Sequence, residues 1–229
     1  MEILKPRLNI LPAPQLRLWG ELLDIPEEFT LYDATALALH LGHRESVDFD
    51  FFGREHFDVD ALADRVPFLA DARTIQRAAN ALTVLVDRAG PIQVSFFGMP
   101  KIGRVASPLL ADDIDLKVAA LIDLAGMKAS VVQKRAEAKD YIDLHALIGH
   151  GIDLPSALSA ASVIYGRQFS PEITLKALTD YSDGDLAKLP DGLKSDLKRA
   201  VAAVDLDKLP TLTAYQAHSA PALGGGSNR

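Results

Sequence analysis

The sequence predicts an α+β fold, in which a small mixed or antiparallel sheet with flanking helices precedes a C-terminal helical bundle. Short segments of the first half alternate apolar and polar residues, which is typical of strands with one buried face. Two such segments, 81–88 and 91–98, meet at the turn-forming residues Ala-Gly-Pro and predict a hairpin. From about Asp115 the spacing of apolar residues becomes helical. The strands therefore come first, and most of the helices follow.

Two helices are expected near the start of the chain. The segment 11–26 has apolar residues at helical spacing and prolines at both ends, so it predicts a short opening helix. The segment 35–42 predicts a second helix, with Asp33 or Thr35 as its N-cap and Gly42 as its C-cap.

The remaining elements follow from the same criteria. Alternation and β-branched or aromatic residues predict strands at 28–33, 46–52, 73–78, 81–88 and 91–98. Residues 116–122 fit one last strand, and 123–151 fit one long helix or two consecutive ones. Proline near the first turn marks three more helices, at 154–166, 170–182 and 189–204. We therefore expect an α/β core over 1–120, a helical region packed on it over 121–210, and a disordered tail over 211–229.

Composition excludes several classes of function. The 229 residues carry a net charge of −7, which argues against a broad basic surface for nucleic acid but allows a local basic groove. The absence of cysteine excludes disulfides and thiolate metal sites. No segment resembles a signal peptide or approaches 18 consecutive apolar residues, so we expect a cytoplasmic protein without membrane contact. Nothing in the sequence indicates specificity for DNA.

Two aspartates lie in a segment otherwise rich in valine and phenylalanine. In a strand over 46–52, Ser46, Asp48 and Asp50 share one face, while Val47 and Phe49 point into the core. The two carboxylates would stand about 7 Å apart at Cα. Such a pair can hold a divalent cation for phosphoryl transfer. The alternative is a solvated strand face with two surface acids.

A second charged segment lies on a predicted helix. Asp140 and Asp143 are three residues apart, so they share a helix face, and Lys139 lies beside them. Lys128 lies about three turns upstream of Asp140. The alternative is a solvated helix with ordinary charge pairs. In either case, one of the two acids could pair with Lys139, Lys134 or Arg135.

These two segments resemble the motifs of a known family. The segment "TALALHLGHRESVDFDFF" is similar to the signature of the AbiEii/AbiGii toxin family of nucleotidyltransferases, within the DNA polymerase β-like superfamily. That signature has a Gly-Gly-Thr or Gly-Ser turn, a helix, and then His-Arg-x-Ser-x-Asp-x-Asp. Lys128 and "KDYIDL" (139–144) match the family's second motif in the same order. The resemblance covers about residues 15–150.

The resemblance implies a role for each matching residue. Asp48 and Asp50 would hold Mg²⁺ or Mn²⁺. The residues implied to bind the NTP are Thr35, Arg44, Ser46 and Lys128. An acid of the Asp140/Asp143 pair would act in the site, or would orient Lys128 or the acceptor. Arg44 could also steady a triphosphate through bidentate contacts.

The sequence departs from the family pattern at two places. Asp33-Ala34 replaces the Gly-Gly, whose backbone amides approach phosphate closely. Asp33 could cap the helix, join the metal site, or weaken nucleotide binding by repulsion. A third carboxylate often completes the metal site in the superfamily, but the corresponding strand has Ser95, which is a poor metal ligand.

The implied function is transfer of a nucleoside monophosphate from an NTP to an acceptor. The acceptor would be RNA, such as a tRNA 3′ end, or a protein hydroxyl. The protein would be the toxin of a toxin–antitoxin or abortive-infection system, opposed by a separate antitoxin protein. Two alternatives remain open. Catalysis could be lost, leaving a protein that binds a partner or a nucleotide, or the acid pair could serve a metal-dependent nuclease.

Overall fold

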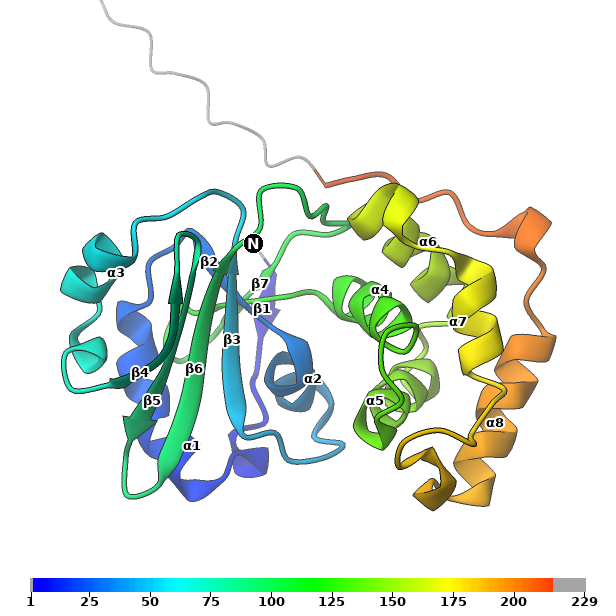
Figure 1. Cartoon of the computed structure of the whole chain (residues 1–229), viewed down its shortest axis with the longest axis horizontal. Helices are drawn as coiled ribbons and strands as arrows, with labels where there is room; N and C mark the ends of the chain where they lie inside the picture. Colours follow the sequence, from blue (N-terminus) through cyan, green and yellow to red (C-terminus); the bar gives the residue numbers. More distant parts are fainter. Residues whose placement is uncertain (1, 216–229) are drawn as a thin grey trace, which may run out of the picture.

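The computed structural model of the chain describes residues 2–215, which form an eight-stranded mixed sheet with helices around and beside it (Figure 1). The strands are β1 (Ile3–Leu4), β2 (Phe29–Tyr32), β3 (Asp48–Gly53), β4 (Arg73–Ala78), β5 (Ala81–Asp87), β6 (Pro91–Gly98), β7 (Leu109–Ala111) and β8 (Lys117–Val118). The α-helices are α1 (Ala13–Trp19), α2 (Asp33–Leu41), α3 (Val59–Arg65), α4 (Leu121–Val131), α5 (Ala138–Gly149), α6 (Leu154–Tyr165), α7 (Pro171–Ala177) and α8 (Asp191–Ala202). The predicted α+β class is confirmed.

The strand order in the sheet is β1-β7-β8-β2-β3-β6-β5-β4. The central strand β3 runs antiparallel to β2 and parallel to β6, so the sheet is mixed. The predicted hairpin joins β5 to β6, and its turn contains Ala89 and Gly90, both with positive φ. The strands β1 and β7 were not predicted, because two or three residues are too few to establish a period.

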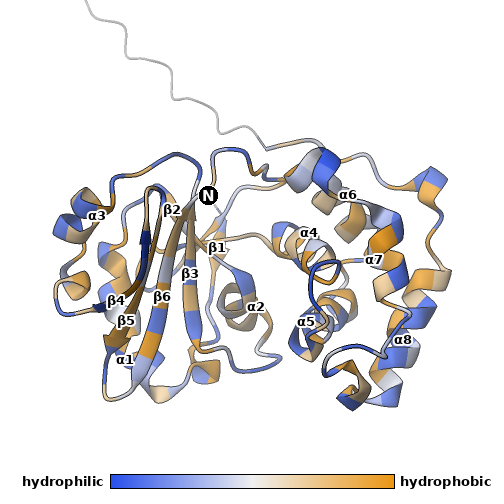
Figure 2. Cartoon of the chain, viewed as in Figure 1, coloured by the Kyte–Doolittle hydropathy of each residue, from blue (hydrophilic) through white to orange (hydrophobic). Residues whose placement is uncertain are grey.

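The two faces of β3 differ in chemistry, as the alternation predicts. Phe49 and Phe51 are fully buried, and Phe51 stacks on Phe96 of β6 with ring centroids 5.2 Å apart. Trp19 of α1 packs on Phe49 from the same side, so this face belongs to the core. Figure 2 shows hydrophobic and hydrophilic residues alternating along β3 and β6. Asp48 and Asp50 therefore lie on the opposite face of the sheet.

The predicted start of this strand was wrong by two residues. β3 begins at Asp48, so Ser46 and Val47 belong to the preceding loop. Val47, which we expected to point into the core, is 61% exposed. Outside the ladder the alternation of faces no longer fixes the direction of a side chain.

Several predicted boundaries of the helices also need correction. The long segment 123–151 forms two helices, because residues 132–137 break the helix between α4 and α5. The last predicted strand shrinks to β8, since α4 already begins at Leu121. Neither Asp33 nor Thr35 caps α2, whose N-cap is Tyr32 with no side-chain hydrogen bond, whereas the C-cap Gly42 is confirmed.

The C-terminal tail lies mostly outside the described residues. Residues 211–215 are described, have no helix or strand, and end where the Tyr215 N–H donates to the Arg104 carbonyl. Within residues 2–215, no single helix is long and apolar enough to cross a membrane.

The helices α4 to α8 form the helical half of the molecule, which lies beside α2 and β3 (Figure 1). Helix α4 contacts both α2 and α6. Gly126 makes the close approach of α4 to α6 possible. A Cβ atom on this residue would lie 2.8 Å from the Ala161 backbone nitrogen and 2.9 Å from the Ala160 carbonyl carbon. Backbone atoms cannot swing aside as a side chain can, so the two helices would have to separate. Because Lys128 lies on the same helix, this packing also positions a predicted site residue.

We expect Gly126→Ala to lower the free energy of unfolding by about 1–2 kcal/mol, since overpacking outweighs the gain in helix propensity. Urea denaturation followed by circular dichroism measures this change. Gly149→Ala is the matched control, because an added Cβ there meets no atom within 4 Å. Equal losses of stability in the two variants would contradict this account of the α4–α6 contact.

Candidate active site

A cavity of about 300 Å³ lies where β3, the N-terminus of α2 and the helices α4 and α5 meet. Its lining residues are Asp33, Ala34, Arg44, Glu45, Ser46, Val47, Asp48, Asp50, Gln93, Lys128, Arg135 and Lys139. Residues from both predicted motifs thus meet in one cavity, although about 80 residues separate the motifs in the sequence.

The two aspartates of β3 lack a cationic partner. Among residues 2–215, neither Asp48 nor Asp50 forms an ion pair. Burial, together with the nearby charge of Asp33, raises the pKa of Asp50 to about 6. Burial also raises the pKa of Asp48. Each anion is therefore held in a place that favours an added positive charge.

This donor set fits a magnesium ion that shares its coordination with a substrate. In the described part of the chain, no three histidine, aspartate or glutamate residues are arranged to hold a metal by themselves. Mg²⁺ is commonly bound by one or two carboxylates, with substrate phosphates and waters completing its octahedron. Asp48 and Asp50 would be those carboxylates.

Ser95 stands where a third carboxylate would complete the acid set. It pairs with Asp50 across the β3–β6 ladder, is buried, and lowers the pKa of Asp50 by hydrogen bonding. A hydroxyl in this place supports the Asp50 carboxylate but adds no negative charge to the site.

Thr35 and Ser46 have different places. The Thr35 side chain is buried, and its hydroxyl donates to the Asp48 carbonyl, which ties the first turn of α2 to β3. Ser46 lines the cavity. The binding of nucleotide by these two residues stays a prediction, and in this structure only Ser46 faces the cavity.

Lys128 is held by three carboxylates. Its Nζ lies 2.5 Å from Asp33 Oδ1, 3.1 Å from Asp140 Oδ1 and 2.9 Å from Asp143 Oδ2, and its side chain is only 3% exposed. Burial opposes its charge, but the three carboxylates outweigh burial and raise its pKa above the ordinary value. Lys128 is therefore a permanent cation at the floor of the cavity.

Asp140 and Asp143 are the buried centres of a charge network. The Arg44 Nε and Nη2 atoms donate to the two oxygens of Asp143, at 2.6 and 2.8 Å. Arg135 binds Asp140 in the same way, at 2.7 and 3.1 Å. Both acids have 0% exposure, so the alternative of a solvated helix is wrong. The expected pairing of one acid with Lys139, Lys134 or Arg135 is confirmed for Asp140 and Arg135.

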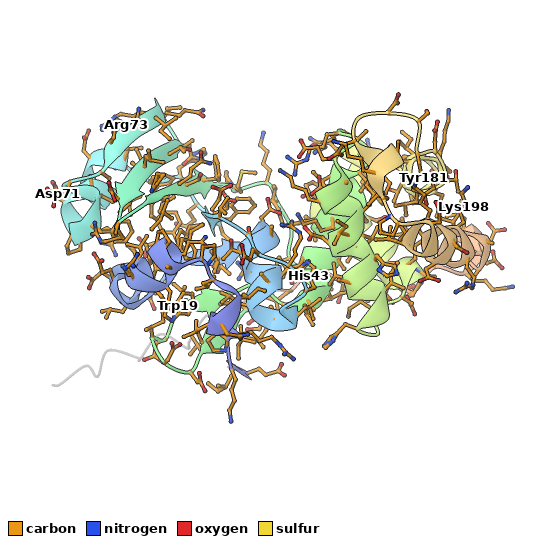
Figure 3. All side chains as sticks on the ribbon, turned by 90° about the horizontal axis from the view of Figure 1, so that it is seen from below. Trp19, His43, Asp71, Arg73, Tyr181 and Lys198 are labelled. Atoms are coloured by element: carbon orange, nitrogen blue, oxygen red, sulfur yellow. The ribbon has the colours of Figure 1, made fainter. Side chains whose placement is uncertain are left out.

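His43 completes this network at the junction of the sheet and the helical half (Figure 3). Its Nε2 lies 2.8 Å from Asp143 Oδ1, and its buried Nδ1 has no hydrogen-bond partner among the described residues. Burial would raise the pKa of Asp143, but hydrogen bonds from His43 and Arg44 hold it well below the usual range. Asp143 therefore stays ionised and fixes its neighbours.

The network changes the predicted role of Arg44. Two of its nitrogens are engaged by Asp143, and Nη1 donates to the Glu45 carbonyl 2.9 Å away. A bidentate grip on a triphosphate would require these bonds to break. Lys139, by contrast, is 52% exposed, pairs with Glu137 and lines the cavity beside Arg135. Sequence reasoning singled out neither Arg135 nor Lys139 as a phosphate contact.

Asp33 occupies the position of a glycine in the family pattern. It has φ of 56°, a left-handed conformation that glycine adopts without strain. Of the three outcomes left open for Asp33, helix capping is excluded, and its carboxylate instead accepts a hydrogen bond from Lys128. The signal for this backbone conformation was present in the sequence, because the pattern requires glycine there.

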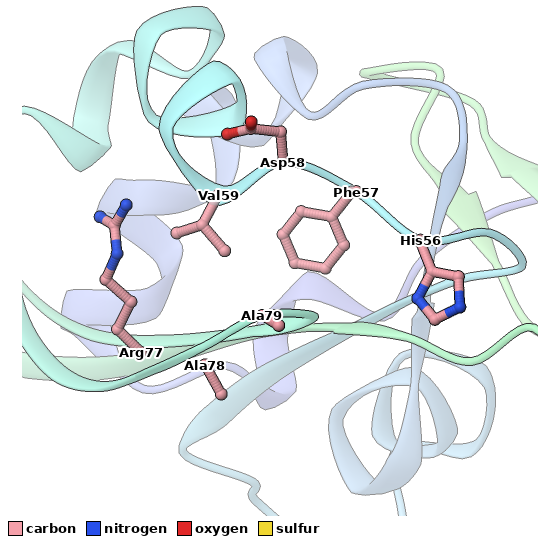
Figure 4. Close-up of a pocket in the computed structure, with 7 residues that line it drawn as sticks. All are labelled: His56, Phe57, Asp58, Val59, Arg77, Ala78 and Ala79. Atoms are coloured by element: carbon pink, nitrogen blue, oxygen red, sulfur yellow. The ribbon is translucent and has the colours of Figure 1, made fainter.

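A larger hollow, of about 710 Å³, lies between the β4–β5 turn and the segment before α3 (Figure 4). Its carboxylate, Asp58, accepts hydrogen bonds from the Asp60 and Ala61 backbone N–H groups and so caps α3. The lining contains no second carboxylate, so this hollow does not offer the chemistry of the cavity at β3.

Comparisons with known proteins identify the family of the chain. A sequence model of the family described as "Nucleotidyl transferase AbiEii toxin, Type IV TA system" matches residues 22–217. A protein of Aquifex aeolicus (strain VF5) is 31% identical over 164 residues, which cover 70% of this chain and 77% of that protein.

Two solved structures share the fold. MenT4, a nucleotidyltransferase toxin from Mycobacterium tuberculosis H37Rv, has a TM-score of 0.59 at 15% identity, over 84% of this chain and 83% of its own. An antigenic nucleotidyltransferase-like protein from Paracoccidioides brasiliensis has a TM-score of 0.52 at 15% identity, over 84% of this chain and 94% of its own. The chain belongs to the AbiEii nucleotidyltransferase toxin family of type IV toxin–antitoxin systems.

Proposed function

We propose that the chain transfers a nucleoside monophosphate from an NTP to an acceptor hydroxyl, with Mg²⁺ or Mn²⁺ bound by Asp48 and Asp50. One observation carries this proposal: two carboxylates without cationic partners lie on one strand face, in a cavity that also contains exposed cations. A solvated acid pair would have an ordinary pKa, whereas that of Asp50 is raised to about 6.

The residues of the cavity have separate roles in this proposal. Lys139 and Arg135 supply positive charge at the surface of the cavity, and the N-terminus of α2 adds the partial charge of its free N–H groups. Together they suit the triphosphate. When bound, the metal neutralises the charge that develops on the attacking and leaving oxygens. Asp143 and Asp140 hold Lys128, Arg44 and Arg135 in place.

The reaction exchanges one phosphorus–oxygen bond for another. The acceptor oxygen forms a bond to the α-phosphorus, the bond from that phosphorus to the β-phosphate oxygen breaks, and pyrophosphate leaves. The hydroxyl proton passes to water. Positioning and electrostatic stabilisation account for most catalysis in reactions of this kind.

The biological role follows from the family. A type IV toxin–antitoxin family implies a separate antitoxin protein. We propose that the toxin acts in the cytoplasm and that its acceptor is RNA, such as a tRNA 3′ end, or a protein hydroxyl.

Binding of Mg²⁺ and NTP can be measured without knowing the acceptor. A ligand that binds only the folded state stabilises it by mass action, by about 2.7 kcal/mol at a hundredfold excess over Kd, and therefore raises the melting temperature. We expect Mg²⁺ with at least one NTP to raise the melting temperature, and either component alone to raise it less. A flat response to every NTP would argue against the proposal.

A second candidate function rests on the contact between Asp33 and Lys128. Asp33 places a negative charge at the N-terminus of α2, where the phosphates are proposed to bind. Its carboxylate also already binds the Lys128 ammonium group. A protein whose site is closed in this way would bind a partner without catalysis.

We expect Asp33→Gly to tighten the binding of Mg²⁺–NTP about fivefold. Removing a like charge about 4 Å from phosphate is worth roughly 1 kcal/mol in water, and glycine adopts the positive φ freely. Titration calorimetry measures the change. Asp33→Asn is the matched control, because asparagine tolerates this conformation but carries no charge. Weaker binding in both variants would instead make Asp33 a metal ligand.

A further inference from the structure

Phe52 and Phe97 lie on the same face of the sheet as Asp48 and Asp50, farther along the strands. In the parallel ladder of β3 and β6, Asp48 pairs with Gln93, Asp50 with Ser95, and Phe52 with Phe97. These pairs share one face because side chains alternate along a strand. Phe52 and Phe97 make an edge-to-face contact, with ring centroids 5.5 Å apart. The acids thus have the phosphate cavity on one side and two aromatic rings on the other.

The Phe97 ring lies at the surface of the protein rather than in the core. It is partly exposed, and within the described residues it lies outside the hydrophobic core cluster. Its neighbour across the next ladder is Ala81, which in turn pairs with Ala78. These small side chains cover little of a neighbouring ring, in agreement with the partial exposure of Phe97.

Positive charge lies at the same end of the strands. Phe52 stacks on Tyr32, with centroids 5.1 Å apart, and the Arg104 guanidinium lies 5.9 Å from the centre of the Tyr32 ring. Arg104 Nε donates to the Tyr32 hydroxyl at 3.1 Å. Arg54 follows directly after β3 and is exposed. Aromatic rings beside arginines are the usual means of binding single-stranded nucleic acid.

The direction of the reaction assigns an occupant to this surface. The cavity includes Asp48, Asp50 and Gln93 but neither Phe52 nor Phe97, so a triphosphate in it lies at one end of the acid pair. In phosphoryl transfer the attacking and leaving oxygens are roughly in line. The acceptor hydroxyl must therefore enter from the end opposite the pyrophosphate, which is the end of Phe52 and Phe97. Phe52 lies about 7 Å along the strand from Asp50, and a ribose bridges a distance of this order between its hydroxyl and its base.

We propose that Phe97, supported by Phe52, is the stacking surface for the terminal nucleobase of an RNA acceptor, with Arg54 and Arg104 beside its backbone. The inference rests on the proposed function and selects RNA over a protein hydroxyl as the acceptor. A protein side chain would gain little from this surface, whereas every nucleobase has a face that can stack.

The test measures RNA binding and nucleotide transfer separately. A short single-stranded RNA with a fluorescent 5′ label reports binding by anisotropy without any chemistry. Mg²⁺–NTP binding is measured by calorimetry. The rate of transfer at several RNA concentrations gives the KM for the RNA. The variants are Phe97→Leu, which keeps an apolar side chain but loses the aromatic face, and Phe97→Trp, which enlarges that face. Ile173→Ala is the control, because Ile173 is exposed on α7, away from this surface.

We expect Phe97→Leu to weaken RNA binding and raise the KM for RNA at least about fivefold, the lower end of the range for base stacking. Affinity for Mg²⁺–NTP should stay within about twofold, and Phe97→Trp should bind RNA as tightly as the wild type. Unchanged RNA binding in Phe97→Leu would overturn the subsite even if transfer occurs. An equal loss of Mg²⁺–NTP affinity would assign the ring to the NTP base and also overturn it. RNA binding that depends on Phe97, without transfer by the wild type, would support the subsite and reject the proposed function.

Discussion

Lys128→Met is expected to lower the free energy of unfolding by about 3 kcal/mol, the low end of the range for breaking a buried ion pair. The substitution keeps the aliphatic volume but leaves Asp140 and Asp143 short of one positive charge, at positions with 0% exposure. The loss stays at the low end because Arg135 and Arg44 still bind these two acids. Urea denaturation at pH 7.5 measures the change.

Lys139→Met is the matched control for this prediction. Lys139 lines the same cavity, but its side chain is half exposed and pairs with the surface residue Glu137. A surface pair of this kind contributes at most about 1 kcal/mol. A loss in Lys128→Met no larger than that in Lys139→Met would contradict the view that Lys128 neutralises the buried acids.

The same network predicts how stability depends on pH. The pKa of Asp143 is held well below its ordinary value, so the folded state binds fewer protons there than the unfolded state. Its contribution to stability is therefore complete above about pH 4 and is lost as the pH falls further. In Lys128→Met, which lacks one of the groups that lower this pKa, the loss on acidification should be smaller.

Asp50→Asn is expected to stabilise the protein by up to about 3 kcal/mol at pH 8 without divalent cations, and to abolish nucleotide transfer. Burial raises the pKa of Asp50 to about 6 in the folded protein, from its ordinary value of 3.8. The folded state therefore binds more protons between these values, and stability falls as the pH rises through this range. Each pKa unit is worth 1.36 kcal/mol, which gives the stated limit. An amide has no charge to bury, so it avoids this cost.

Thermal unfolding at pH 5 and pH 8, with and without Mg²⁺, separates the two effects of Asp50. The variant should gain most over the wild type at pH 8 without Mg²⁺, and Mg²⁺ should stabilise the wild type more than the variant. Asp48→Asn is the control, and a smaller gain is expected there because Asp48 is less buried. A variant less stable than the wild type at pH 8 would indicate that Asp50 already has a favourable partner.

The local parts of the site could be predicted from the sequence. Strict alternation placed Asp48 and Asp50 on one face and Phe49 and Phe51 on the other, because the period of a strand is two residues. The turn at Ala89-Gly90 was predicted because glycine and the following Pro91 are turn-forming residues, although the positive φ of Ala89 does not follow from its residue type.

The long-range parts could not be derived from local pattern. Arg44 binds Asp143 across 99 positions of sequence, and Lys128 binds Asp33 across 95. No periodicity relates such residues, and only the resemblance to a family brought the two motifs together. The contacts of Phe97 were missed for the same reason. An aromatic residue in a strand is expected in the core until the register of the neighbouring strands shows which residues lie beside it.

Label transfer tests the central claim most directly. The purified protein is incubated with Mg²⁺, total tRNA and each labelled NTP in turn, with Asp50→Asn beside it as a folded control. We predict that label from at least one NTP moves to RNA with the wild type, that transfer requires Mg²⁺, and that Asp50→Asn transfers none. Absence of transfer from every NTP, to RNA or to protein, would contradict the account, as would equal transfer by Asp50→Asn.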